Sequence, residues 1–530
     1  MALNLPKSTS LLAVVFIFIF KSGLYGANDK TFTARIVSAE TNLPLAAAVS
    51  ITTGQKVTLK PDNSSENVFY LDKEYWYVDG EFSITTGEDS LIIDIRHGLE
   101  TYPISETIYL PDSDDISKEF KLKRWTNLSG KGYYSGDTHV HFLETKSAHL
   151  QMQAEDLQVV NLLTSDFTND VDKFTGQLDQ ISTQSHLIYV GQEIRDWQMG
   201  HISILQLKEL IQPVEFCGGR LISMYDNPNM LLSPRLEEIK KQQAVSVWAH
   251  FTNLPGMESV VAIPLGLIDA IELMTYDDPT QLPSHWEPWD YSEMSQAEFT
   301  AMRGMDLYYQ YLNTGFNVPI TAGTDKMGPN IPVGSNRHYI PIQGEFSYEK
   351  WVNGLKSGRG FITNGPILNF TVDDHTAGDS TIFSGEKTVK VTLQAQSLLP
   401  YGRLEIIANG KLVAWENLKA ADQEKIYSQE LAAEITLSES TWIIGRVTSV
   451  GLSKMLPRNL TVFAHSNPVF LFRDGKPTYV PASENYLKLY QKAAVNWVEK
   501  YSNFKNGTER ERALQYLQEA QKALTERHKE

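Results

Sequence analysis

The sequence predicts a multidomain α/β protein, in which a central region of repeated strand and helix units lies between two all-β modules and is followed by a helical tail. Three observations lead to this prediction. Short alternating runs of apolar and polar residues fill the N-terminal part, strand-like and helical patterns alternate after Gly130, and strand-like alternation returns from about Phe370. The chain has 530 residues, which is enough for roughly three or four domains.

The N-terminal module comprises residues 28–126. Runs such as residues 31–37 and 90–95 alternate apolar and polar side chains, as strands with one buried face do. Turn-forming pieces such as residues 60–63 separate these runs. We therefore expect a small β-sandwich-like module.

The central region comprises residues 127–369, and its repeated strand and helix patterns predict a mainly parallel sheet. Proline, capping and glycine signals mark its helices. We expect one helix over residues 235–243 after Ser233-Pro234, one that begins at the capping box of Ser295 and Glu298 and stops near Gly315, and one over residues 347–357 that stops at Gly358.

A second β-sandwich is expected over residues 370–474, and the tail over residues 475–530 has helical spacing. The tail is interrupted near Asn506-Gly507, so it predicts two helices. They either pack back onto the body of the protein or form an appendage that binds a partner.

The N-terminus has the layout of a secretory signal peptide. Lys7 precedes an apolar run over residues 11–20, and the small residues Gly26-Ala27 close the segment. The apolar run is too short to span a bilayer. We expect removal of residues 1–27, a secreted or periplasmic protein and no membrane span. Cys217 is the one cysteine, so no intrachain disulfide is expected.

The charge of the chain argues against some partners. Lys and Arg number 47 against 64 Asp and Glu, which gives a net charge of -17. Such an acidic chain is not expected to bind nucleic acid or an anionic lipid surface. A small-molecule substrate is the expected partner, and the sequence leaves the oligomeric state open.

A pair of histidines gives the first indication of chemistry. His139 and His141 stand two residues apart in a strand-like segment, so both imidazoles point to one face and can converge on one ion. Solvated or hydrogen-bonded histidines also occur at this spacing, and the pair alone leaves that alternative open.

Further candidate ligands follow apolar runs in the same region. Glu193, His250 and Asp325 each stand at the end of such a run, where parallel β/α folds collect functional residues, and His201 follows Glu193 closely enough to return to the same edge. Taken alone, Glu193 and Asp325 could instead be helix caps or acids in turns, and His201 could be a capping or loop histidine. Together, these nitrogen and oxygen ligands suit one or two divalent ions of Zn, Mn or Fe.

These residues lie in motifs that resemble a known family. The central region is similar to the PHP (polymerase and histidinol phosphatase) superfamily, and more closely to the CehA/McbA family of exported metallohydrolases. The resemblance implies a PHP-like distorted β/α barrel with a hydrolytic metal centre. It rests on the motifs Tyr134-Ser135-Gly136-Asp137-Thr138-His139-Val140-His141, Gly191-Gln192-Glu193-Ile194-Arg195, Gly200-His201, Trp248-Ala249-His250, Ile268-Asp269-Ala270-Ile271-Glu272, Leu312-Asn313-Thr314-Gly315-Phe316, Ala322-Gly323-Thr324-Asp325 and Gly360-Phe361-Ile362-Thr363-Asn364-Gly365-Pro366.

The resemblance also implies how the ligands divide between two ions. His139, His141, Glu193 and Asp325 would hold one ion, and a second would lie between Glu193, His201 and His250. The chain departs from the superfamily pattern at Asp166-Phe167 and Asp325-Lys326-Met327, where histidines are often found. A third ion is therefore not expected, and His149 is a weak substitute for a missing ligand.

We hypothesise that bound metal lowers the pKa of a water towards about 7 for attack on a carbonyl or phosphoryl centre. Asp325 or His250 is expected to handle the proton. Arg195 and Arg337 follow the Glu193 and Asp325 strands, so they are candidates for binding an oxyanion or a substrate carboxylate, with a surface arginine as the alternative.

The substrate class is open. Named members of the resembled family cleave an aryl carbamate, which favours an ester, carbamate or amide substrate; fold does not fix the substrate. An aromatic cluster fits an aryl or sugar-like substrate, with ordinary packing as the alternative. A phosphoesterase and a non-catalytic glycan-binding or adhesion protein are the other functions considered. The cluster comprises Trp286, Trp289, Tyr291, Tyr308 and Tyr309.

Overall fold

The computed structural model describes most of the chain from Lys30 onward, and the protein is a mixed α/β structure with more strand than helix. The expected signal peptide, the start of the helix predicted from Ser295, and Trp286, Trp289 and Tyr291 lie outside the described residues. The structure describes residues 30–64, 66–70, 73–111, 116–165, 170–214, 217, 227–251, 256–275, 305–423, 425–449, 453, 456 and 460–529.

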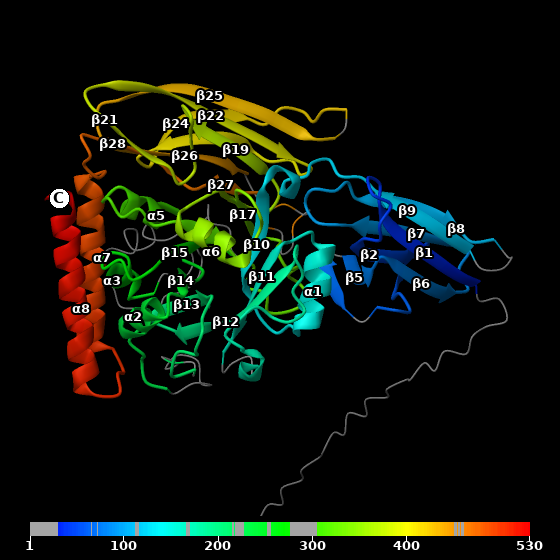
Figure 1. The fold of residues 1–530 in the computed structure, drawn as a ribbon, viewed down its shortest axis with the longest axis horizontal. Coiled ribbons are helices and arrows are strands. Elements are labelled where there is room, and N and C mark those ends of the chain that lie inside the picture. Colours follow the sequence, from blue (N-terminus) through cyan, green and yellow to red (C-terminus); the bar gives the residue numbers. More distant parts are fainter. Residues whose placement is uncertain are drawn as a thin grey trace, which may run out of the picture.

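Two sheets form the N-terminal module, which lies at one end of the molecule (Figure 1). Alternate residues of both sheets, such as Phe32, Val49 and Phe120, are buried in one apolar core. One sheet has the order β6 (Glu81–Thr86), β1 (Lys30–Ser38), β9 (Ile116–Leu122); the other has the order β4 (Asn67–Tyr70), β5 (Lys73–Asp79), β2 (Ala46–Thr53), β7 (Ser90–Arg96), β8 (Ile104–Tyr109), with β3 (Thr58–Leu59) paired to β2.

The central sheet is only partly parallel, unlike the mainly parallel sheet expected from the sequence. The turn at residues 197–199 is too short for a helical crossover, so β13 returns antiparallel to β12 and also lies antiparallel to β14. The strand order is β16 (Ile320–Ala322), β15 (Ala270–Met274), β14 (Val245–Trp248), β13 (Gly200–Leu205), β12 (Leu187–Asp196), β11 (Val159–Thr164), β10 (Tyr133–Val140), β17 (Arg337–Pro341), β18 (Phe361–Thr363).

The helices of the central region lie beside this sheet. The Ser347 side chain caps α6 by accepting a hydrogen bond from the Lys350 amide, and Gly358 follows the helix with a φ of 63°, as its sequence signals predicted. The helices are α1 (Thr145–Ala154), α2 (Ser233–Lys241), α3 (Ser259–Ala262), α5 (Met305–Leu312) and α6 (Tyr348–Lys356), with 3₁₀ turns η1 (Ser129–Lys131) and η3 (Val171–Lys173).

The start of α2 differs from the expected serine cap. Ser233 is the first residue of the helix, and the cap residue Leu232 offers no side-chain hydrogen bond. The carboxylate of Glu258 instead accepts hydrogen bonds from the Ser233 amide at 3.0 Å and the Ser233 hydroxyl at 2.6 Å. A distant acid therefore satisfies the helix end, and no local sequence pattern could predict it.

Burial raises the pKa of Glu258 to about 7, despite the lowering effect of its hydrogen bonds. The folded chain then binds more protons than the unfolded chain between about pH 4.5 and 7, so stability falls as the pH rises through this range. The free energy of unfolding should therefore decrease from pH 5 to pH 7.5. We expect this decrease to be smaller in Glu258→Gln than in the unsubstituted chain, by on the order of 2 kcal/mol. Urea unfolding at both pH values measures this, and an identical pH dependence in both chains would contradict it.

The C-terminal module continues the central sheet, because β18 pairs with β27 across the expected boundary near residue 370. A second sheet covers this extension, and side chains such as Leu393 and Ile443 form the core between them. The continued strands are β27 (Ala464–Ser466), β26 (Thr441–Thr448), β23 (Arg403–Ala408), β24 (Lys411–Asn417), β28 (Val469–Arg473) and β21 (Ser380–Phe383); the covering strands are β20 (His375–Thr376), β19 (Ile367–Val372), β22 (Lys387–Ser397) and β25 (Tyr427–Leu437).

Two long helices, α7 (Pro481–Lys500) and α8 (Gly507–Glu526), and the 3₁₀ turn η5 (Arg527–Lys529) end the chain. They lie side by side at the end opposite the N-terminal module (Figure 1). Trp497 and Leu517 are buried in the core that also contains α3 and α5, so the tail packs onto the body of the protein. None of the described helices combines the length and apolar character needed to cross a membrane.

Candidate metal centre

Strands of the central sheet bring all six predicted ligands together in two groups. The first ligand group is His139, His141 and Asp325, and the second ligand group is Glu193, His201 and His250. Every one of these residues is buried. His139 and His141 lie two residues apart at the end of β10, and His250 and Asp325 follow the ends of β14 and β16, as the sequence indicated. The antiparallel pairing of β13 with β12 brings His201 close to Glu193.

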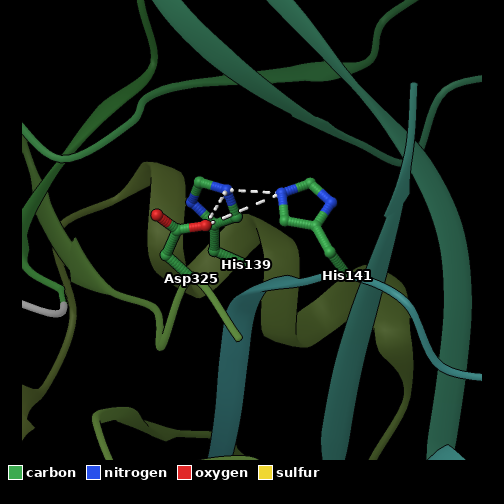
Figure 2. A group of neighbouring side chains, drawn as sticks. All are labelled: His139, His141 and Asp325. Atoms are coloured by element: carbon green, nitrogen blue, oxygen red, sulfur yellow. Dashed lines mark hydrogen bonds and ion pairs between the residues drawn. The ribbon is translucent and has the colours of Figure 1, made fainter. Parts of the chain in front are cut away.

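The first ligand group surrounds a single point (Figure 2). Nε2 of His139 lies 3.0 Å from Nε2 of His141. Oδ1 of Asp325 lies 3.5 Å from the first nitrogen and 3.8 Å from the second. Figure 2 shows the other carboxylate oxygen of Asp325 pointing away from both rings.

The second ligand group has a similar geometry. Nδ1 of His201 lies 3.0 Å from Nε2 of His250. Oε1 of Glu193 lies 3.3 Å from the His201 nitrogen and 4.0 Å from the His250 nitrogen. Two imidazoles and one carboxylate thus face each other at distances that one small cation can span.

Glu193 connects the two groups. Its Oε1 also lies 3.6 Å from Nε2 of His139, and its Oε2 lies 3.1 Å from Nε2 of His141. The strand pairing explains this position, because β12 lies between β11 and β13 and directs the side chain to the middle of the ligand set. Glu193 therefore has carboxylate oxygens within 4 Å of imidazoles of both ligand groups.

The histidine tautomers of the first ligand group follow from their second nitrogens. Nδ1 of His141 lies 2.8 Å from the carbonyl oxygen of Leu163, which can only accept, so this nitrogen carries the proton. Nδ1 of His139 donates to the carboxylate of Glu272 at 3.0 Å. Nε2 of His139 then lies 3.0 Å from Nε2 of His141. A proton held by one of these nitrogens, or a cation bound by both, makes that arrangement favourable.

Burial and the neighbouring charges shift the pKa values of the ligands. Burial opposes ionisation of Glu193, but Arg195 and His139 outweigh it and hold its pKa well below the usual range. Burial likewise opposes the charge on His139, and Glu272, Asp325 and Glu193 together raise its pKa well above the usual range. The centre therefore contains ionised carboxylates that favour positive charge beside them.

The second ligand group is different, because burial dominates its histidines. Burial, with help from His201, lowers the pKa of His250 to about 3. Burial also lowers the pKa of His201, although Glu193 opposes the shift. Both imidazoles are thus neutral at pH 7, the form in which histidine binds a metal.

The carboxylate oxygens of the centre fit a divalent cation. Among the described residues, neither carboxylate oxygen of Glu193 nor Oδ1 of Asp325 accepts a well-aligned hydrogen bond, although all three are buried. Backbone φ angles of 34° at His250 and 46° at Asp325 are uncommon for non-glycine residues and mark a constrained site. A nitrogen and oxygen set of this composition suits Zn, Mn or Fe.

The two candidate arginines have different surroundings. Arg195 stands at the end of β12, and its Nε lies 3.0 Å from Oε2 of Glu193, so it belongs to the centre. Arg337 contacts neither ligand group among the described residues, so its position does not support the expected role at an oxyanion. Its buried guanidinium donates to the carbonyl oxygens of Gly334 at 2.6 Å and Glu155 at 3.0 Å, which fixes it as a structural residue.

Two described members of the expected aromatic cluster lie in the core. Tyr308 and Tyr309 are buried on α5, and the hydroxyl of Tyr309 lies 2.9 Å from Nε2 of His465 in the C-terminal module. Packing in the core accounts for both residues, as the alternative interpretation expected. His149 is outside both ligand groups, and its ring lies near His186 instead.

The sequence interpretation did not assign a role to Glu272. This fully buried carboxylate lies on β15 and contacts His139 and the backbone of His250. The available signal was an acid inside an otherwise apolar strand, since a charged side chain buried there needs a partner. Asp137 is a second buried acid without an assigned role: its Oδ1 accepts from the His139 and Thr324 amides at 3.0 Å each, and ties β10 to the Asp325 loop.

No family model matches the chain, and no curated protein matches it either. Its similarities to solved structures include phospholipase PlaB from Legionella pneumophila, with 15% identity and a TM-score of 0.11 over 18% of this chain and 25% of that one. They also include β-glucuronidases from Parabacteroides merdae, with 11% identity and a TM-score of 0.18 over 82% of this chain and 61% of that one, and from Bacteroides uniformis, with 9% identity and a TM-score of 0.15 over 85% and 58%. The chain spans less than two thirds of each of these proteins, and likenesses at these TM-scores carry no argument about its fold or function.

Proposed function

We propose that this chain is a metal-dependent hydrolase with a binuclear centre, which acts on an ester, carbamate or amide bond of a small aryl or sugar-like molecule. One observation carries the proposal. Four imidazoles and two carboxylates converge in two groups, with Nε2 of His139 3.0 Å from Nε2 of His141 and Glu193 reaching both groups.

In this proposal each ligand group would hold one ion of Zn, Mn or Fe, with Glu193 shared between them. When bound, such ions activate a water and polarise the oxygen of the bond to be cleaved. Asp325 is the proposed proton acceptor, because its second carboxylate oxygen points away from both imidazoles (Figure 2). Burial of the ligand side chains excludes bulk water and strengthens every charge interaction in the centre.

A distorted β/α barrel is the fold that this proposal implies for the central region. It is supported by a parallel bridge between Val140, at the end of β10, and Lys326, just after β16. The amide of His141 also donates to the carbonyl oxygen of Lys326 at 3.0 Å. We also propose that the protein is exported to the periplasm or secreted, as the sequence of residues 1–27 indicates.

Arg195 is proposed to stabilise developing negative charge on the substrate. We expect Arg195→Ala to lower kcat/KM by about 100-fold without loss of folding, since removal of one such donor has an effect of this size. Arg337→Ala is the matched control: it removes the guanidinium that donates to the carbonyls of Gly334 and Glu155, so it should lower the unfolding temperature while the folded fraction keeps its kcat/KM. Normal kcat/KM in Arg195→Ala would exclude the role.

A substrate screen tests the proposed reaction. The purified chain, loaded with Zn, Mn or Fe, is incubated with aryl esters, aryl carbamates, aryl amides and aryl phosphates, and release of the aryl alcohol or amine is followed. Turnover of the carbon-centred substrates that is lost in His139→Ala supports the proposal. Release of phosphate alone would favour a phosphoesterase, and no turnover together with glycan binding would favour the adhesion protein.

A further inference from the structure

Glu272 is a fully buried carboxylate that lies beside the centre but belongs to neither ligand group. Its Oε2 accepts hydrogen bonds from Nδ1 of His139 and from the backbone amide of His250, each at 3.0 Å. Its Oε1 lies 3.0 Å from the hydroxyl of Thr138. One side chain on β15 therefore contacts residues of both β10 and the segment after β14.

These contacts reach one ligand of each group. His139 belongs to the first ligand group, and its hydrogen bond to Glu272 through Nδ1 leaves Nε2 as the nitrogen that faces the centre. His250 belongs to the second ligand group, and its backbone has a φ of 34°. The hydrogen bond from the His250 amide to Glu272 helps to hold this rarely adopted conformation.

A third strand end is packed against the same carboxylate. A Cβ atom on Gly323, just after β16, would lie 2.2 Å from Oε1 of Glu272 and 2.5 Å from Cβ of His139. Only glycine allows this close approach, which brings the segment leading to Asp325 against the other ligand-bearing strands. The carboxylate thus lies where the three segments that carry His139, His250 and Asp325 meet.

We propose that Glu272 is the positioning residue of the metal centre. It orients the His139 imidazole through Nδ1 and makes Nε2 a better electron donor to the cation. It also holds the His250 backbone in a fixed position relative to the His139 imidazole. The inference rests on the metal-binding part of the proposed function and is independent of the bond that is hydrolysed. Outer carboxylates of this kind change metal affinity by about 10- to 100-fold.

The glutamine variant separates the charge of Glu272 from its shape. In Glu272→Gln the amide oxygen can still accept from His139 and from the His250 amide. The new amide nitrogen then faces the Thr138 hydroxyl, which can accept its hydrogen bond and donate to the carbonyl oxygen of Ala322 at 3.0 Å. We therefore expect the fold to survive while the negative charge behind His139 is lost.

The test is a Zn²⁺ titration of the full chain at pH 7 in competition with a chelator of known affinity. We expect a dissociation constant about 10- to 100-fold higher in Glu272→Gln than in the unsubstituted chain, and a shifted visible spectrum when both chains are saturated with Co²⁺. Glu258→Gln is the matched control, because it removes a buried carboxylate that binds Leu232 and Ser233 instead of a ligand. Its Zn²⁺ affinity should equal that of the unsubstituted chain.

The outcomes distinguish this inference from the proposed function. If the unsubstituted chain binds no Zn²⁺, Mn²⁺ or Fe²⁺, the metal centre itself is wrong. If it binds Zn²⁺ and Glu272→Gln binds it equally well, only the role of Glu272 is overturned. Should Glu272→Gln fail to fold, Thr138→Val replaces it: a lower Zn²⁺ affinity supports the role and an unchanged affinity overturns it.

Discussion

Glu193→Gln is expected to reduce the metal content from about two ions per chain to less than one, and to lower kcat by at least about 1000-fold. The reason is the position of its carboxylate between the two ligand groups, with Oε1 3.3 Å from His201 and Oε2 3.1 Å from His141. Glutamine has almost the same shape, but one oxygen becomes an amide nitrogen that cannot bind a cation. Metal analysis and steady-state kinetics on the same preparation measure both effects.

Glu258→Gln serves again as the control for a buried carboxylate. It is expected to keep both ions and its kcat, because its effect is confined to the start of α2. Retention of two ions and normal kcat in Glu193→Gln would show that Glu193 does not bridge the two groups.

The second prediction with a large effect is that substitutions in one ligand group remove the ion of that group and leave the ion of the other. We expect the double variant His139→Ala with Asp325→Ala to lose hydrolysis entirely and to retain at most one ion, because it removes two of the three members of the first ligand group. The double variant His201→Ala with His250→Ala should keep about one ion in the first ligand group and lose most of its activity. Metal content and kcat are measured for both double variants.

His149→Ala is the control for histidine removal, because His149 lies outside both ligand groups. It should bind as much metal as the unsubstituted chain. A first-group double variant with full activity would contradict the assignment of the centre, and equal metal content in all three variants would show that neither group binds metal.

Local patterns were enough to predict that these candidate ligands lie together. His139 and His141 follow from the two-residue period of a strand, and His250 and Asp325 follow from their places after β14 and β16. The cap at Ser347 and the stop at Gly358 are equally local, and α6 has both. Such features depend on a few neighbouring residues, so the sequence contains the information needed to predict them.

Features that depend on distant contacts could not be predicted. The role of Arg337 is decided by carbonyl groups of Gly334, Glu155 and Asp156, two of which lie far away in the sequence. Pairing of β18 with β27 joins the central sheet to the C-terminal module across a boundary that composition placed near residue 370. These outcomes are set by tertiary packing, which hydrophobic periodicity does not specify.

The metal content of the purified full chain tests the central claim most directly. The protein is loaded with Zn, Mn or Fe, desalted and analysed by plasma mass spectrometry beside its His139→Ala variant. The two ligand groups predict about two ions per chain and a lower content in the variant. Retention of no metal under any loading condition would contradict the proposed centre and, with it, the proposed hydrolase.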